Sequence, residues 1–129
     1  MIGRFFFFAL CLAGPAPALP FAPVEQVRLF AICAGRYSAL AEHQALFDGG
    51  ASEAAGARRD LFVELLEAVL PDAPALRGET ALAWRVAAKH AQAVLLRRAS
   101  FLDDRAAAER SRQAAEYHFA ECRASVLGG

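Results

Sequence analysis

The chain has 129 residues, 57% of them hydrophobic, and its 14 basic and 14 acidic side chains cancel to a formal net charge of zero. This length predicts a single domain with a modest core, and the balanced charge gives no electrostatic reason to expect nucleic acid as a partner. Lys89 is the only lysine among the basic residues. The Arg-rich and Ala-rich composition suggests a GC-rich bacterial genome.

The first eighteen residues have the parts of a secretory signal peptide. Arg4 precedes an apolar run over residues 5–13, and the small residues Pro15-Ala16-Pro17-Ala18 follow. The run is shorter than the roughly 20 residues that cross a bilayer. We therefore expect cleavage after Ala18 and export to the periplasm or medium. The mature protein would be one domain of residues 19–129 and would not be an integral membrane protein.

Two amphipathic helical segments are predicted in the first half of the mature chain. The first covers residues 23–47, with Pro23 in its first turn, and Asp48-Gly49-Gly50 ends it. The second covers residues 52–70, with Ser52 as its predicted N-cap. Gly56 weakens the start of this second segment, and Pro71 ends it.

Two further helical segments are predicted in the second half. The third covers residues 79–102 and carries two adjacent rows that we expect to face the core: Leu82, Val86, Ala93 and Leu96, and Ala83, Ala87, His90, Val94 and Phe101. The fourth covers residues 105–127, with Asp103 or Asp104 as its cap. Its apolar stripe consists of Ala108, Ala115, Phe119, Cys122 and Val126.

Four amphipathic helices joined by short loops predict an all-α, up-down-up-down four-helix bundle. No segment alternates apolar and polar residues as a strand does, so we expect no strand. The alternative is a three-helix core against which the Ala-rich start of the fourth segment packs loosely.

The cysteines predict one disulfide. Cys11 lies in the signal peptide, and Leu10 stands where a lipidation motif needs a small residue. Cys33 and Cys122 remain, on the stripes of the first and last helices, in a compartment where disulfides persist. A bridge would close a loop of nearly ninety residues and stabilise the fold by ~4–5 kcal/mol; the alternative is two buried free thiols. Gly35, next to this position, allows a close helix contact.

The third segment carries only positive charge after Glu79. With Trp84, its basic residues form a candidate partner-binding face: Trp84, Arg85, Lys89, Arg97 and Arg98. The simpler interpretation is that the acidic second helix neutralises them across a shared edge. The sharper one is a docking face for an unknown protein or an anionic surface.

The histidines provide the alternative site. His118 and Cys122 share a helix face at metal-ligand spacing, and His90 and His43 could ligate haem. A metal- or haem-binding bundle using His43, His90 and His118 is therefore the second hypothesis. The simpler interpretation is that these histidines are structural or solvated, with no metal and no cofactor.

No nucleophile or acid–base pair matches a catalytic motif, and an enzyme is the third hypothesis. The sequence thus predicts a small exported accessory or interaction protein without catalytic activity. Its Ala-rich faces also allow a homo-oligomer.

Overall fold

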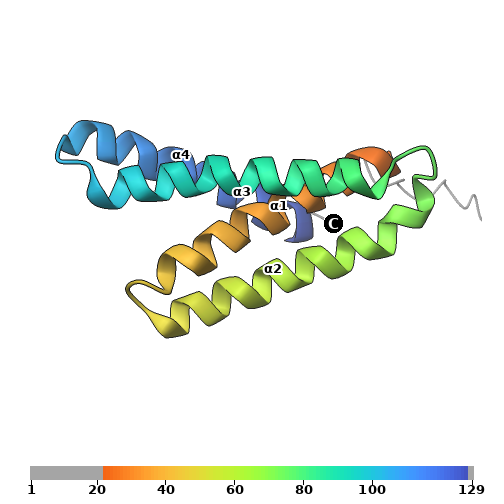
Figure 1. The fold of residues 1–129 in the computed structure, drawn as a ribbon, viewed down its shortest axis with the longest axis horizontal. Coiled ribbons are helices and arrows are strands. Elements are labelled where there is room, and N and C mark those ends of the chain that lie inside the picture. The colour runs from red at the N-terminus through yellow and green to blue at the C-terminus, as the bar shows by residue number, and fades with distance from the viewer. Residues whose placement is uncertain (1–21, 128–129) are drawn as a thin grey trace, which may run out of the picture.

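The computed structural model describes residues 22–127, which fold into four α-helices and a short 3-10 turn (Figure 1). The elements are α1 (Pro23–Gln44), α2 (Gly49–Val69), η1 (Leu70–Asp72), α3 (Gly78–Phe101) and α4 (Arg105–Leu127). Within these residues there is no strand. The predicted signal peptide, residues 1–18, lies outside the described residues.

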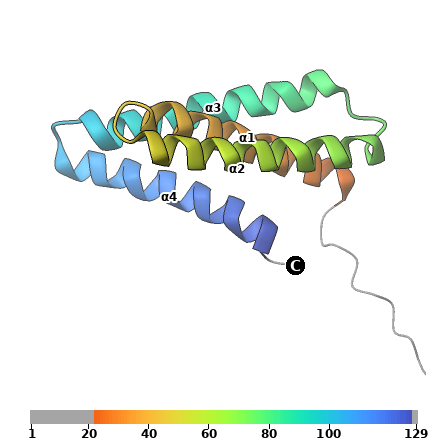
Figure 2. The same ribbon diagram turned by 90° about the horizontal axis from the view of Figure 1, so that it is seen from below.

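Successive helices are antiparallel, so the fold is the predicted up-down-up-down four-helix bundle (Figures 1 and 2). Helix α1 is the central element and packs against both α2 and α3, while α4 lies mainly along α3 and reaches α1 at a few positions. The bundle is therefore held together by α1 rather than by four equal neighbour contacts.

The turn between α1 and α2 differs from the prediction. Helix α1 ends at Gln44, three residues early, and α2 begins at Gly49 because Asp48, not Ser52, is its N-cap. The Asp48 carboxylate accepts the backbone N–H of Ala51 at 3.1 Å. The Ser52 hydroxyl instead donates to the carbonyl of Ala41 at 2.8 Å, which ties α2 to the last turns of α1.

The ends of α3 and α4 are close to the prediction. Helix α3 is shifted by one residue, and α4 has the predicted bounds. Of the two candidate caps for α4, Asp104 takes the role, because its carboxylate accepts the N–H groups of Ala106 and Ala107.

A disulfide joins Cys33 of α1 to Cys122 of α4, as predicted, with the two Cα atoms 5.7 Å apart. Both cysteines are completely buried. Around them, Tyr37 stacks on Phe62 of α2 and contacts Phe119 of α4, and because Leu96 of α3 belongs to the same cluster, it connects all four helices. A second cluster lies nearer the start of α1 and contains Val27, Ala31, Leu66, Ala73 and Ala81.

Helix α3 is rotated relative to the prediction. Ala93 and Leu96 turn inward, but the other members of the two predicted rows are exposed: Leu82, Val86, Ala83, Ala87, His90, Val94 and Phe101. The buried positions of α3 are Ala81, Gln92 and Leu96. The prediction that these two rows face the core is therefore wrong for seven of their nine residues.

We attribute this rotation to a close contact at Gly35 of α1. A Cβ atom at Gly35 would lie 2.1 Å from the carbonyl oxygen of Arg85 and 3.0 Å from the amide nitrogen of Lys89. The backbones of α1 and α3 thus touch at this point, which only a residue without a side chain permits. The contact brings the small residues of α3, such as Ala81, toward α1 and leaves Leu82 and Val86 outside.

Among the helices of residues 22–127, none combines the length and the apolar character needed to cross a membrane.

Candidate functional site

A groove of about 320 Å³ lies between α1, α3 and α4. It is lined by polar and charged side chains at its edges and by an apolar floor: Arg28, Ile32, Arg36, Trp84, Ala87, Ala88, Ala91, Gln92 and His118. Small alanines of α3 leave the space, because a longer side chain there would fill it. The volume is at the lower end of the range for small-molecule sites.

One edge of the groove carries a cation–π pair. The Arg28 guanidinium lies 5.5 Å from the centre of the Trp84 ring. Arg28 is exposed and has no ion pair among residues 22–127, although Glu25 lies beside it in an adjoining hollow. The pair therefore presents a positive charge and a large apolar ring at the same edge.

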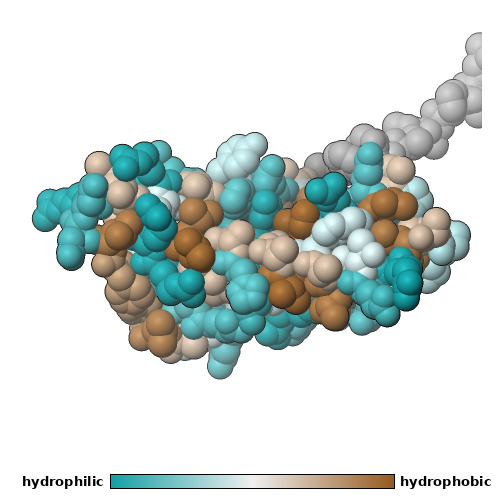
Figure 3. Space-filling view, turned by 45° about the horizontal axis from the view of Figure 1, so that its top comes forward, coloured by the Kyte–Doolittle hydropathy of each residue, from teal (hydrophilic) through white to brown (hydrophobic). Residues whose placement is uncertain are grey.

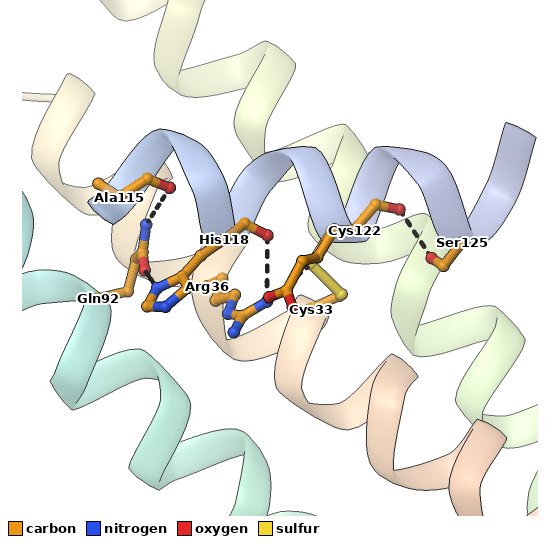
Figure 4. A network of polar contacts seen from close by, with 8 residues as sticks. Cys33, Arg36, Gln92, Ala115, His118, Cys122 and Ser125 are labelled. Atoms are coloured by element: carbon orange, nitrogen blue, oxygen red, sulfur yellow. Dashed lines mark hydrogen bonds and ion pairs between the residues drawn. A yellow bond between two sulfur atoms is a disulfide. The ribbon is translucent and has the colours of Figure 1, made fainter. Parts of the chain in front are cut away.

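A buried amide positions the histidine of the groove (Figure 4). Gln92 is 1% exposed, and its Nε2 donates to the Ala115 carbonyl at 3.2 Å. Its Oε1 then faces Nδ1 of His118 at 2.9 Å. Because a carbonyl oxygen only accepts, Nδ1 carries the proton and Nε2 of His118 remains an acceptor.

The surroundings of His118 favour its neutral form. Burial and the charge of Arg36 lower its pKa, while Glu121 acts in the opposite direction. The neutral ring can accept a hydrogen bond through Nε2, and the bond to Gln92 holds the ring in place.

Arg36 lies between His118 and the disulfide (Figure 4). Its Nη1 donates to the His118 carbonyl, to Glu121 at 3.0 Å and to the sulfur of Cys122. Every hydrogen bond of Arg36 within residues 22–127 uses Nη1. Nε and Nη2 therefore remain available as donors toward the groove or solvent.

The predicted partner-binding residues do not share one surface. Trp84 is half-buried in the groove. Lys89 forms an ion pair with Glu42 of α1. Arg85 faces α2: the pKa of Asp60 is lowered first by a hydrogen bond from Arg59 and then by the charges of Arg59 and Arg85.

Arg97 and Arg98 differ from these residues. Both are exposed, and neither is in an ion pair within the part of the chain that the structure describes. Arg97 lies near His43, and burial followed by the Arg97 charge lowers the pKa of His43.

Exposed apolar side chains accompany these two arginines. We use "outward face of α3" for the exposed residues Leu82, Val86, His90, Val94, Arg97, Arg98 and Phe101. Leu82 and Phe101 have 59% and 60% of their surface exposed, and Val86 and Val94 have 44% each. Figure 3 shows apolar and polar side chains interspersed along the length of the bundle. At its end, Phe101 contacts the exposed Phe47, with the ring centres 6.0 Å apart.

The three histidines do not form one site. His43 bonds the hydroxyl of Ser100, His118 bonds Gln92, and His90 is exposed. Cys33 and Cys122 are joined to each other and offer no thiolate. Among residues 22–127, no three His, Cys, Asp or Glu side chains are grouped to hold a metal ion. The metal- or haem-binding hypothesis stays a prediction.

Sequence reasoning missed Arg28, Arg36 and Gln92. The signal for the first two was present: Arg28, Ile32 and Arg36 recur every four residues and so line one edge of α1. Gln92 gave no comparable signal, because only the packing of α4 on α3 supplies partners for its amide.

No protein-family model, no curated protein and no solved structure matches this chain.

Proposed function

We propose that this chain is an exported, non-catalytic interaction protein that docks a partner protein on the outward face of α3. The observation that carries the proposal is the exposure of Leu82, Val86, Val94 and Phe101 on one helix. Several large apolar side chains exposed on one helix face support a protein interaction site there, and aromatic side chains are enriched at the energetic centres of such sites.

The charges of the face indicate the chemistry of the partner. Arg97 and Arg98 are without ion pairs among the described residues, next to the apolar part of the face. The only acidic residue of α3, Glu79, lies at its far end beside Arg77. A complementary partner therefore presents an apolar helix or strip flanked by Asp and Glu.

Export is part of the proposal. The signal-like start of the sequence predicts it, and the buried Cys33–Cys122 disulfide supports it, because such bridges persist in oxidising compartments.

Site-specific photocrosslinking in the producing cells tests the proposal. A photoreactive residue at Val94, on the outward face, should give one adduct in the exported fraction. Tyr117, which is 64% exposed on α4, is the matched control position and should give none. Replacing both Arg97 and Arg98 by Glu should abolish the Val94 adduct.

Three outcomes would contradict the proposal. An equal yield of adducts at Val94 and Tyr117 would show non-specific contact. An adduct unaffected by the two Arg→Glu changes would contradict the claim that the partner presents acidic side chains to Arg97 and Arg98. An adduct with twice the mass of the chain would replace the partner protein by a second copy of this protein.

A further inference from the structure

The groove between α1, α3 and α4 is separate from the contacts that the proposed docking requires. Its charged and polar groups come from three helices: Arg28 and Arg36 from α1, Gln92 from α3 and His118 from α4. None of these four residues belongs to the outward face of α3. The inference about the groove and the proposed docking therefore rest on different side chains.

The groups of the groove select an anion with an apolar body. The Arg28 guanidinium at the edge, and Nε and Nη2 of Arg36 deeper in, are the available donors. A planar guanidinium matches the two oxygens of a carboxylate. Glu121 occupies Nη1 of Arg36 alone, so it leaves the other donors of that side chain available.

The floor of the groove indicates that the rest of the ligand is apolar. Ala87, Ala88, Ala91 and Ile32 present only methyl and methylene groups, and the Trp84 ring closes one side. Burying these surfaces under a compact apolar group is favourable, whereas a polar group would find no hydrogen-bond partner on them. A free inorganic anion would leave this floor in contact with water.

We infer that the groove binds a small carboxylate with a compact apolar body, whose carboxylate lies at Arg28 and whose body covers the alanine floor beside Trp84. Nε2 of His118 accepts a hydrogen bond from a hydroxyl or amino group where the ligand carries one. The buried amide of Gln92 keeps that acceptor in place.

Trp84 provides a direct measurement, because it is the only tryptophan in the chain. The full chain is titrated with cyclohexanecarboxylate, which does not absorb where tryptophan is excited, and the Trp84 emission is followed. The expected result is a saturable change with one site per chain. Cyclohexylmethanol, the neutral analogue, should bind at least about tenfold more weakly because it lacks the charge-assisted hydrogen bonds, and inorganic phosphate should give no saturable change.

A matched pair of variants assigns the anion to Arg28. Arg28→Gln should weaken cyclohexanecarboxylate binding about tenfold. Arg58→Gln, an exposed arginine on α2 outside the groove, should leave the affinity unchanged. Circular dichroism checks that both variants keep the helical fold.

The inference is overturned by any of four results: no saturable change in emission, equal binding of the acid and the alcohol, full affinity in Arg28→Gln, or an equal loss in Arg58→Gln. None of these results bears on the docking face of α3, whose crosslinking test uses different residues.

Discussion

The contact at Gly35 makes the sharpest prediction about stability. Gly35→Ala adds a methyl group whose carbon would lie 2.1 Å from the carbonyl oxygen of Arg85. That atom is backbone, so it cannot move aside as a flexible side chain would, and α3 has to separate from α1 by more than 1 Å to restore ordinary contact. Such overpacking costs ~1–3 kcal/mol.

The same substitution has a gain that must be subtracted. Replacing glycine by alanine inside a helix stabilises by up to ~1 kcal/mol through backbone entropy. Gly56 of α2 isolates this gain, because a Cβ there would meet only the end of the Arg59 side chain at 3.7 Å. We therefore expect Gly56→Ala to stabilise the protein by ~0.5–1 kcal/mol.

We expect Gly35→Ala to lower the free energy of unfolding by ~1–2 kcal/mol after the two effects are combined. For a domain of this size that is a fall in Tm of roughly 5–15 °C. Thermal and urea unfolding, followed by circular dichroism on the oxidised protein, measure both variants. A Gly35→Ala protein as stable as Gly56→Ala would refute the close backbone contact and the explanation of the rotation of α3.

Three further perturbations have defined outcomes. Replacing Cys33 and Cys122 by Ala removes a link between residues 89 apart and should lower the free energy of unfolding by ~4 kcal/mol in the chain-entropy model; equal urea midpoints for this variant and the oxidised protein would contradict it. Asp48→Ala removes the N-cap of α2 and should cost ~1 kcal/mol, whereas Asp103→Ala, at an exposed position that caps nothing, should cost close to nothing; similar losses in both would show that the cap is not the cause. Burial lowers the pKa of His118 in the folded state, so the unfolded chain binds this proton more tightly and stability should fall as the pH drops below the unfolded value of ~6.5. The loss of stability between pH 7.5 and pH 5 should be smaller in His118→Gln, and an unchanged loss would exclude His118 as a source.

The ends of the helices could be read from the sequence because local chemistry decides them. Each of these ends depends on a residue within one turn of it: Pro23 at the start of α1, Pro71 after α2 and Asp104 before α4. Asp48 shows where such reading fails. The sequence indicates Asp48 as part of the stop for α1 and Ser52 as the cap of α2, although both residue types are common caps. The choice between them depended on Ala41, whose carbonyl accepts the Ser52 hydroxyl.

The disulfide could also be predicted, because two cysteines on the apolar stripes of the first and last helices leave only one pairing in such a bundle. The effect of this disulfide on the groove could not be predicted from the sequence. Arg36 lies one turn after Cys33, and the bridge to Cys122 brings it to His118 and Glu121 of α4. Residues 82–89 apart in the chain meet beside this covalent link.

The residues alone predict the all-α class, the number of helices, their approximate bounds and the pairing of Cys33 with Cys122. Hydrophobic periodicity and capping are local properties, and they survive in any packing of the four helices. The buried face of α3, in contrast, depends on how the helices pack. Helix α3 has apolar residues on more than one side, so its periodicity does not choose between them, and the backbone contact at Gly35 does. That contact leaves Leu82, Val86 and Val94 in solvent, and it gives the protein the outward face on which its proposed function rests.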